Sequence, residues 1–484
     1  MINKRLSSAE TAAQLGVKPA TVYAYVSRGV LSRQRSPAGS TFDAKEVAVL
    51  ARTSRHASGR SAVMPRRGGE SRREATGIGA DGPAGMASHA GAEGRAGVAG
   101  RAGAAGRADG GEGADPVFVT ELTLIDRGRL YYRGVDAVAL SRTATFEEVA
   151  EWLWTGQSST GGLPWRTPPA AAEAVAQVLR SVGSDSQPVE KFMVAVATAA
   201  LTDELRHALS PASVLVVGPG LLSTLVDALP LQVGAARRRR VADDSGGSVS
   251  SGSSVSTARL RSARSSLSAR LWPRLSPLPL TPARQSVLEA ALVLSADHEL
   301  APSTLAARVA AAFRADPYAV VSTGLGPASG SWPSGSSGAP SEVESLLAEA
   351  LAGDPGRTIG ERLRRVGSAV YGFGMPLYPG GDPRGAELLA RLPEISGRAD
   401  RHVVVERVRA IGQARGFPPP NVDLGLGALA FCGEMIPGAG QAIATLGKVA
   451  GWLAHAIEEY ASPTRFRTRA AYIGTAPERA GTEP

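Results

Sequence analysis

The sequence predicts a mostly α-helical protein, in which a helical body follows a small N-terminal domain and a linker. Three observations support this fold class. Apolar residues recur every three to four positions over most of residues 117–475, as they do on one face of a helix. Strand-like patterns in this body are confined to residues 118–132. A stretch rich in Gly, Ala and Arg, with almost no large apolar side chain, separates the two parts.

The chain of 484 residues carries a formal net charge of +9, and this charge is unevenly distributed. Residues 1–75 contain 14 basic and 5 acidic side chains, so they account for the whole excess. Residues 237–274 contain 9 basic and 2 acidic side chains, and the rest of the chain is acidic at −7. An apolar fraction of 43% is enough to build a core, which excludes a wholly disordered chain.

The single cysteine, Cys432, excludes an intramolecular disulfide framework and any multi-cysteine metal site. No metal site is predicted. We find no charge-free apolar run of 18 residues, and the first residues (MINKRLSSAE) have no apolar signal core. We therefore expect a cytoplasmic protein without a membrane segment.

Residues 1–55 have the pattern of a helix-turn-helix. Ser7 and Glu10 have the spacing of a capping box and predict a short helix through Leu15. Gly16 supplies a turn, and Pro19 then stands in the first turn of a second helix, residues 20–27, where its missing N–H costs nothing. An apolar seam joins the two helices. Its members are Ala12, Leu15, Val17, Val22 and Val26.

The exposed side of that second helix would carry side chains that suit phosphates and base edges. These are Thr21, Tyr23, Tyr25 and Arg28. The next residues, LSRQRSPAGSTFDAKEVAVL, resemble the wing and third helix of the MerR and excisionase type of winged helix-turn-helix. This resemblance implies that Arg33 and Arg35 contact the backbone of double-stranded DNA. The alternative is a small three-helix module that binds a protein or has no partner.

Two low-complexity stretches interrupt the chain. Residues 56–116 cannot bury enough apolar surface to offset the entropy of ordering them, so we expect a flexible linker. Residues 237–276 begin with four arginines and continue through a Ser- and Gly-rich run, which predicts a disordered surface insert.

The body is predicted to be a series of helices with one hairpin at its start. Thr145 and Ser341, each followed by glutamates, look like N-terminal caps. The hairpin pairs residues 118–125 with residues 129–132 across Asp126-Arg127-Gly128. The clearest predicted helices span residues 144–153, 189–200, 286–294, 303–313, 342–350 and 439–460.

Five ordered blocks of the body resemble the citrate and 2-methylcitrate synthases. The first is VTELTLIDRGRLYYRGVDAVALSRTATFEEVAEWLWTG, from Val119. The others are SADHELAPSTLAARVAAA, GFGMPLYPGGDPRG, PNVDLGLGAL and GKVAGWLAHAIEEY, and the chain then continues into RFRTRAAYIG. The resemblance implies a helical homodimer with an active site in the cleft between two domains. A large domain would comprise residues 117–345 and 434–475, and a small domain residues 346–433.

The resemblance also implies a Claisen-type condensation of an acyl-CoA substrate, acetyl- or propionyl-CoA, with oxaloacetate and no cofactor. Asp423 matches the base that takes a proton from the acyl group, His298 a substrate-binding histidine, and Arg384 an oxaloacetate-binding arginine. Arg467 matches the arginine that reaches the site from the partner subunit.

Four positions depart from the family's pattern. Met375 stands in place of the histidine that polarises the oxaloacetate carbonyl, and a thioether has no proton to donate. Residues 330–340 replace a Pro-Leu-His-Gly block and contain no histidine. Lys448 replaces a substrate-binding arginine, and Ser295 a further histidine. Because two catalytic histidine positions are substituted, we expect weakened or divergent activity.

Each retained residue also has a structural alternative. Asp423 could cap the following helix, Arg384 could form a surface ion pair with Asp382, and His298 could be a hydrogen-bonded helix residue. His455 is expected to be structural. Two functions remain open: a condensing enzyme, or a DNA-binding regulator that uses the enzyme-like body as a sensor of dicarboxylates or acyl-CoA.

Overall fold

The computed structural model describes most of the body and part of the N-terminal segment. The described residues are 5–15, 17, 22, 26, 31, 33–36, 39–44, 47, 118–157, 163, 165–183, 185–232, 266–330, 339–366, 370–395 and 397–462. The predicted linker, residues 237–265 of the predicted insert, Thr21, Tyr23, Tyr25, Arg28 and Arg467 lie outside them.

The N-terminal segment has a three-stranded antiparallel sheet in the order β1-β3-β2, formed by β1 (Arg5–Ser7), β2 (Arg33–Ser36) and β3 (Gly39–Asp43). The capping box is confirmed, because the Ser7 N–H donates to Glu10 at 2.8 Å and the Glu10 N–H to Ser7 Oγ at 3.3 Å. It opens α1 (Ser8–Leu15), which ends where the sequence predicts. Of the predicted seam, Ala12, Leu15 and Val22 are buried and Val17 and Val26 pack against them.

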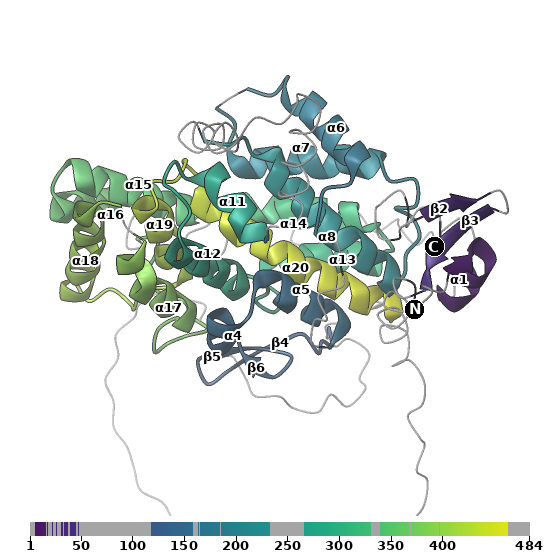
Figure 1. Cartoon of the computed structure of the whole chain (residues 1–484). Coiled ribbons are helices and arrows are strands. Elements are labelled where there is room, and N and C mark those ends of the chain that lie inside the picture. The colour runs from purple at the N-terminus through teal and green to yellow at the C-terminus, as the bar shows by residue number, and fades with distance from the viewer. Residues whose placement is uncertain are drawn as a thin grey trace, which may run out of the picture. The chain divides into compact units, whose positions relative to one another are not determined.

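The body begins with a second small sheet and is otherwise helical (Figure 1). The predicted hairpin is confirmed as β4 (Thr123–Asp126) and β5 (Arg129–Tyr132), with a tight turn at Arg127 and Gly128, both at positive φ. A third strand, β6 (Val135–Asp136), was not predicted.

The helices of the body follow in chain order, many of them beginning at a proline, where the missing N–H has no intrahelical partner in any case. They are α4 (Ala137–Thr143), α5 (Phe146–Thr155), α6 (Pro169–Leu179), α7 (Pro188–Leu201), α8 (Pro211–Ala228), α11 (Leu267–Leu275), α12 (Pro282–Leu294), α13 (Pro302–Ala312), α14 (Pro317–Ala328), α15 (Ala339–Ala352), α16 (Pro355–Val366), α17 (Pro383–Arg391), the 3-10 helix η1 (Leu392–Glu394), α18 (Ala399–Ala414), α19 (Val422–Cys432) and α20 (Ala439–Ala461).

The core of the body surrounds α20, which packs against α5, α8, α12, α13, α14 and α19 (Figure 1). This helix is buried on all its faces and contributes Trp452 to the core. α8 is likewise buried and carries no charge until Asp227. It is long and apolar enough to cross a membrane (18 residues, mean hydropathy 1.4), contrary to the sequence prediction, but 78% of it is buried by the rest of the chain. A helix covered in this way is a core helix.

Two sequence predictions about the helices are wrong. The predicted insert, residues 237–276, runs too far, because α11 forms within it and buries Leu267, Leu271 and Trp272. Thr145 does cap α5 through a capping box with Glu148, but Ser341 is not a cap. It lies inside the first turn of α15, which begins two residues earlier.

Candidate active site

Five of the predicted site residues, contributed by separate parts of the body, line one small cavity of about 30 Å³. They are His298, Met375, Arg384, Asp423 and Lys448. Ser295 and Pro340, from two of the positions that depart from the expected pattern, line it as well. Residues 331–338 and Arg467 lie outside the described part of the chain.

Asp423 lies in the first turn of α19 but does not cap it. The cap is Asn421, whose side-chain oxygen accepts from the N–H groups of Asp423 at 3.0 Å and Leu424 at 3.3 Å. The capping alternative for Asp423 is therefore wrong. Its side chain is 3% exposed, and its Oδ2 has no hydrogen-bond partner among the described residues. Burial raises the pKa of Asp423 to about 6, against the opposing effect of Lys448 and Arg384.

The loop that carries Met375 is tied by its backbone to the segment before Asp423. The Gly374 N–H donates to the Pro419 carbonyl at 2.8 Å, and the Asn421 N–H to the Gly372 carbonyl at 3.0 Å. The Asn421 amide also donates to the Gly374 carbonyl at 2.9 Å. Both glycines have positive φ, which a side chain would strain. These bonds place the thioether of Met375 on the wall of the same cavity as Asp423.

Arg384, at the start of α17, is paired with Asp382. Its Nε lies 3.0 Å from Oδ1 and its Nη2 2.8 Å from Oδ2 of that aspartate. The two side chains are 6% and 0% exposed, so the alternative of a surface ion pair is wrong. A bidentate pair fixes the plane of the guanidinium, which then faces the cavity in one orientation.

His298 stands in the turn after α12, not in a helix. Its Nε2 lies 2.8 Å from the hydroxyl oxygen of Tyr378, whose ring also lies under the Arg384 guanidinium at 5.4 Å. Burial, with Arg384 and Lys448 nearby, holds the pKa of His298 well below its usual range. The imidazole is therefore neutral near pH 7. Tyr378 was not among the predicted site residues, although it stands three residues after Met375 in the same loop.

Lys448 reaches the cavity because α20 lies very close to the turn that carries Ser295. A Cβ added to Gly447 would lie 2.6 Å from Ser295 Cβ and 2.8 Å from the Leu292 carbonyl oxygen, so only glycine fits there. Burial lowers the pKa of Lys448 to about 8, which Asp423 opposes and Arg384 reinforces. The cavity thus holds two basic side chains and one unsatisfied carboxylate oxygen.

His455, about two helical turns further along α20 than Lys448, serves the structure as predicted. Its ring nitrogens lie 2.8 Å from Arg308 Nη1 and 3.3 Å from Asp297 Oδ2, and all three side chains are buried. Arg308 is also paired with Glu459. This network holds the turn before His298 against α20.

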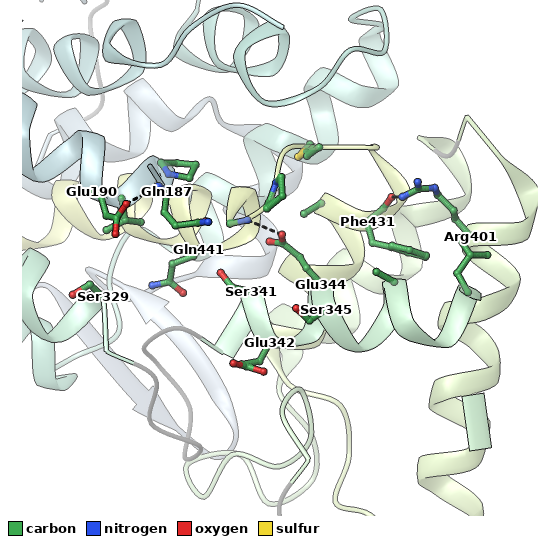
Figure 2. Close-up of a pocket in the computed structure, with 18 residues that line it drawn as sticks. Gln187, Glu190, Ser329, Ser341, Glu342, Glu344, Ser345, Arg401, Phe431 and Gln441 are labelled. Carbon is green, nitrogen blue, oxygen red and sulfur yellow. Dashed lines mark hydrogen bonds between the residues drawn. The ribbon is translucent and has the colours of Figure 1, made fainter. Parts of the chain in front are cut away.

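A larger cavity of about 550 Å³ lies at the N-termini of α7, α15 and α20 (Figure 2). Figure 2 shows Glu344 pointing to the start of α20, where its carboxylate accepts from the Gly438 and Gly440 N–H groups at 2.9 and 2.8 Å. Arg401 is bonded to the Phe431 carbonyl, and Glu342 is paired with Arg362. The main charged groups of this cavity are thus engaged within the protein, whereas the small cavity keeps an unsatisfied carboxylate oxygen.

Residues 113–469 match the family model described as citrate synthase, C-terminal domain. The chain belongs to the citrate synthase family. It is 29% identical over 383 residues to the Haloferax volcanii citrate synthase, a match that covers 75% of this chain and 95% of that protein. It is 28% identical over 197 residues to citrate synthase 2 of Bacillus subtilis, which spans 40% of this chain and only 52% of that relative.

The fold of this citrate synthase family member also matches a solved structure. The ternary complex of the Thermoplasma acidophilum citrate synthase with carboxymethyl-coenzyme A and oxaloacetate aligns with a TM-score of 0.57 at 20% identity. The alignment covers 75% of this chain and 95% of that structure. At this identity the likeness supports the fold alone.

Of the residues predicted to contact DNA, only Arg33 has a described side chain, and it is exposed on β2. The backbone of Arg35 belongs to the same strand, and its side chain lies outside the described residues.

Proposed function

We propose that this protein condenses an acyl-CoA, acetyl- or propionyl-CoA, with oxaloacetate, and that Asp423 is the base. The observation that carries the proposal is the buried carboxylate of Asp423, which neither caps its helix nor uses Oδ2 for a hydrogen bond among the described residues. A pKa of about 6 leaves it mostly ionised at neutral pH and more basic than an exposed aspartate. Family membership and the ligands bound in the Thermoplasma complex, carboxymethyl-coenzyme A and oxaloacetate, support this reaction class.

The remaining cavity residues would bind the oxo acid. Arg384 and Lys448 supply positive charge for its carboxylates, and His298 is a neutral hydrogen-bond partner. In a homodimer, Arg467 of a second subunit would add a further cation. No cofactor enters this scheme, because the acyl-CoA is itself a substrate.

The turnover of this reaction is expected to be slow. Met375 cannot donate a proton or a hydrogen bond to the oxaloacetate carbonyl. The sequence of residues 330–340 also contains no histidine to stabilise the enol. Loss of one preorganised donor typically lowers kcat by about 10²–10³-fold. Two such losses predict a weak enzyme, or one whose preferred acyl group differs from that of its relatives.

Release of coenzyme A thiol from acetyl- or propionyl-CoA in the presence of oxaloacetate tests this function. We expect slow turnover that Asp423→Asn abolishes and that Asp400→Asn, a change of an exposed aspartate on α18, leaves unchanged. Equal turnover in the Asp423→Asn variant and the parent protein, or none with any acyl-CoA tried, would contradict the proposal.

We infer a second candidate function, that of a DNA-binding regulator whose body senses dicarboxylates or acyl-CoA. It is supported by the positive charge of residues 1–75 and by the exposed Arg33 on the β2–β3 hairpin, next to a helix opened by a capping box. Salt-dependent binding of the full chain to random duplex DNA tests it. We expect Arg33→Glu to weaken binding and Arg357→Glu, on α16, to leave it unchanged. Absence of any salt-sensitive binding would remove this candidate.

A further inference from the structure

The proposed condensation uses Lys448 only as a positive charge and makes no use of the nucleophilicity of its amine. A guanidinium at this place could only bind an anion, whereas an amine is also a nucleophile when it loses its proton. Lys448 lies on α20 directly after Gly447, and the close approach of α20 to Ser295 aims this residue into the cavity shared with Asp423 and Arg384.

The surroundings of Lys448 make the neutral amine more abundant than it is in an exposed lysine. Burial lowers its pKa to about 8, and the permanent charge of Arg384 acts in the same direction. Desolvation and a neighbouring cation are the two conditions that activate lysines toward carbonyl carbons. Asp423, which opposes the shift, has a pKa of about 6, so the site holds an amine and a carboxyl that can exchange protons near neutral pH.

Neither Met375 nor the Nε2 atom of His298 is available in this cavity to polarise a substrate carbonyl through a hydrogen bond. Met375 has no proton to donate, and the Nε2 atom of His298 is already hydrogen-bonded to the Tyr378 hydroxyl. A carbonyl bound here would therefore lie beside a nucleophilic amine with few hydrogen-bond donors in competition for its oxygen. An iminium is a stronger electron sink than a carbonyl and needs no such donor.

We propose that Lys448 forms an imine with the 2-oxo group of a short 2-oxo dicarboxylic acid and thereby decarboxylates oxaloacetate to pyruvate without acyl-CoA. This activity rests on the proposed function in one respect, namely that oxaloacetate occupies this cavity. It goes beyond that function because it requires neither the second substrate nor a new carbon–carbon bond.

The steps balance without an oxidant or a metal. The neutral Nζ attacks C2, the carbonyl oxygen takes one proton from this nitrogen and one from solvent, the C2–O bond breaks as water leaves, and a protonated iminium remains. The bond between C3 and C4 then breaks, CO₂ leaves from the C4 carboxylate, and its bonding electrons form an enamine with the iminium as acceptor. C3 takes a proton, with Asp423 in its carboxylic acid form as the donor in the cavity. Water then hydrolyses the pyruvate iminium and restores the amine.

Borohydride trapping in the full-length protein tests the imine directly. We expect incubation with oxaloacetate and borohydride to leave a reduced oxaloacetyl or pyruvyl adduct on Lys448, located by peptide mass spectrometry.

Pyruvate should form from oxaloacetate in the presence of EDTA, which suppresses decarboxylation by free metal ions. Lys448→Arg keeps the charge but cannot form an imine, so it should lose the adduct and lower pyruvate formation by more than about tenfold. Lys191→Arg, a change on α7 outside the cavity, should do neither.

Three results separate this inference from the proposed function. Thiol release and an oxaloacetate-induced rise in melting temperature, without any adduct on Lys448, would overturn the inference and leave the condensation standing. Pyruvate formation retained by a folded Lys448→Arg variant, judged by an unchanged melting temperature, would also overturn it. If oxaloacetate neither raises the melting temperature nor supports thiol release, both proposals are wrong.

Discussion

Asp382 binds Arg384 through both carboxylate oxygens, at 3.0 Å from Nε to Oδ1 and 2.8 Å from Nη2 to Oδ2. The same carboxylate accepts the backbone N–H of Arg384, as the cap of α17, and that of Val422 at 3.0 Å, at the start of α19. One fully buried side chain therefore joins the helix that carries Arg384 to the helix that carries Asp423. The relative position of the arginine and the proposed base depends on it.

We predict that Asp382→Asn lowers the free energy of unfolding by about 3–5 kcal/mol, the usual cost of leaving a buried charge without its partner. Oxaloacetate binding should weaken as well, because Arg384 loses its fixed orientation. Urea unfolding and oxaloacetate-dependent melting shifts measure the two effects. Asp400→Asn is the control, since Asp400 also binds an arginine two residues away, Arg398, although here the arginine comes first and both side chains are exposed. It should change stability by less than about 1 kcal/mol. Similar effects of the two variants would refute the positioning role of Asp382.

Tyr378→Phe tests the bond between Tyr378 and His298. The hydrogen bond between the Tyr378 hydroxyl and Nε2 fixes the orientation of the neutral imidazole, whichever of the two atoms is the donor. Without it the ring loses this partner, and we expect oxaloacetate affinity to fall about tenfold, or about 1.4 kcal/mol. Titration of the melting temperature with oxaloacetate measures the change. Tyr131→Phe, on β5 and outside the cavity, should have no effect. An unchanged affinity in Tyr378→Phe would show that the hydroxyl does not position His298 for the substrate.

The rate of thiol release should depend on pH through Asp423. The base must be ionised, and burial raises its pKa to about 6, so turnover should be low at pH 5 and rise as the pH passes through 6. Initial rates between pH 5 and 8 at saturating substrates give the profile. A half-maximum near pH 4, the value of an exposed aspartate, would contradict the burial of the ionised base.

The sequence predicted the long helices of the body well, because their apolar periodicity is uninterrupted. Residues 439–460 became α20, and Thr145 caps α5 as expected. α11 was missed because the Ser- and Arg-rich composition of the preceding residues continues into it. Leu267, Leu271 and Leu275 do recur every four residues, as on one face of a helix, but the polar residues around them made this pattern hard to recognise.

The candidate site could be assembled from the sequence only where a motif named its members. Asp423, Arg384 and His298 do line one cavity with Lys448. Tyr378 and Asp382 were not singled out as site residues, because their roles arise from contacts between segments 40 to 80 residues apart in the chain. Periodicity and local spacing describe neighbours along one helix or strand, so they do not predict contacts between distant segments of the chain.

The junction of α17 and α19 depends on a glycine. A Cβ on Gly385 would lie 2.3 Å from the Asn421 carbonyl oxygen. Because this is a backbone atom, it cannot move away by a change of rotamer. We predict that Gly385→Ala destabilises the protein by more than about 2 kcal/mol through this overlap and reduces thiol release by displacing Arg384. Gly326→Ala, also within a helix but with open space around the added Cβ, should be neutral or stabilise by up to about 1 kcal/mol. Thermal unfolding of both variants makes the comparison, and equal stability would contradict the close contact.

A pair of buried carboxylates that do not line the cavity, Glu147 and Glu289, should make stability depend on pH. Glu147 accepts the Leu267 N–H at 2.5 Å, and Glu289 accepts the Phe146 N–H at 2.9 Å. Burial, with repulsion from Glu289, raises the pKa of Glu147 to about 7. Because this is above the unfolded value of 4.5, the folded state holds the proton more tightly. The resulting stability is fully present below pH 4.5 and is lost as the pH rises through 7.

Glu147→Gln removes this charge while its amide oxygen can still accept the Leu267 N–H. We therefore expect the variant to be more stable than the parent at pH 8, by about 1–2 kcal/mol, and to lose most of the decline between pH 5 and 8. Urea unfolding at pH 5, 6.5 and 8 measures both effects. Glu361→Gln, an exposed glutamate paired with Arg357 on α16, is the control and should leave the pH dependence of the parent intact. A variant Glu147→Gln that is less stable than the parent at pH 8 would mean that the carboxylate stabilises the start of α11 by more than its burial costs.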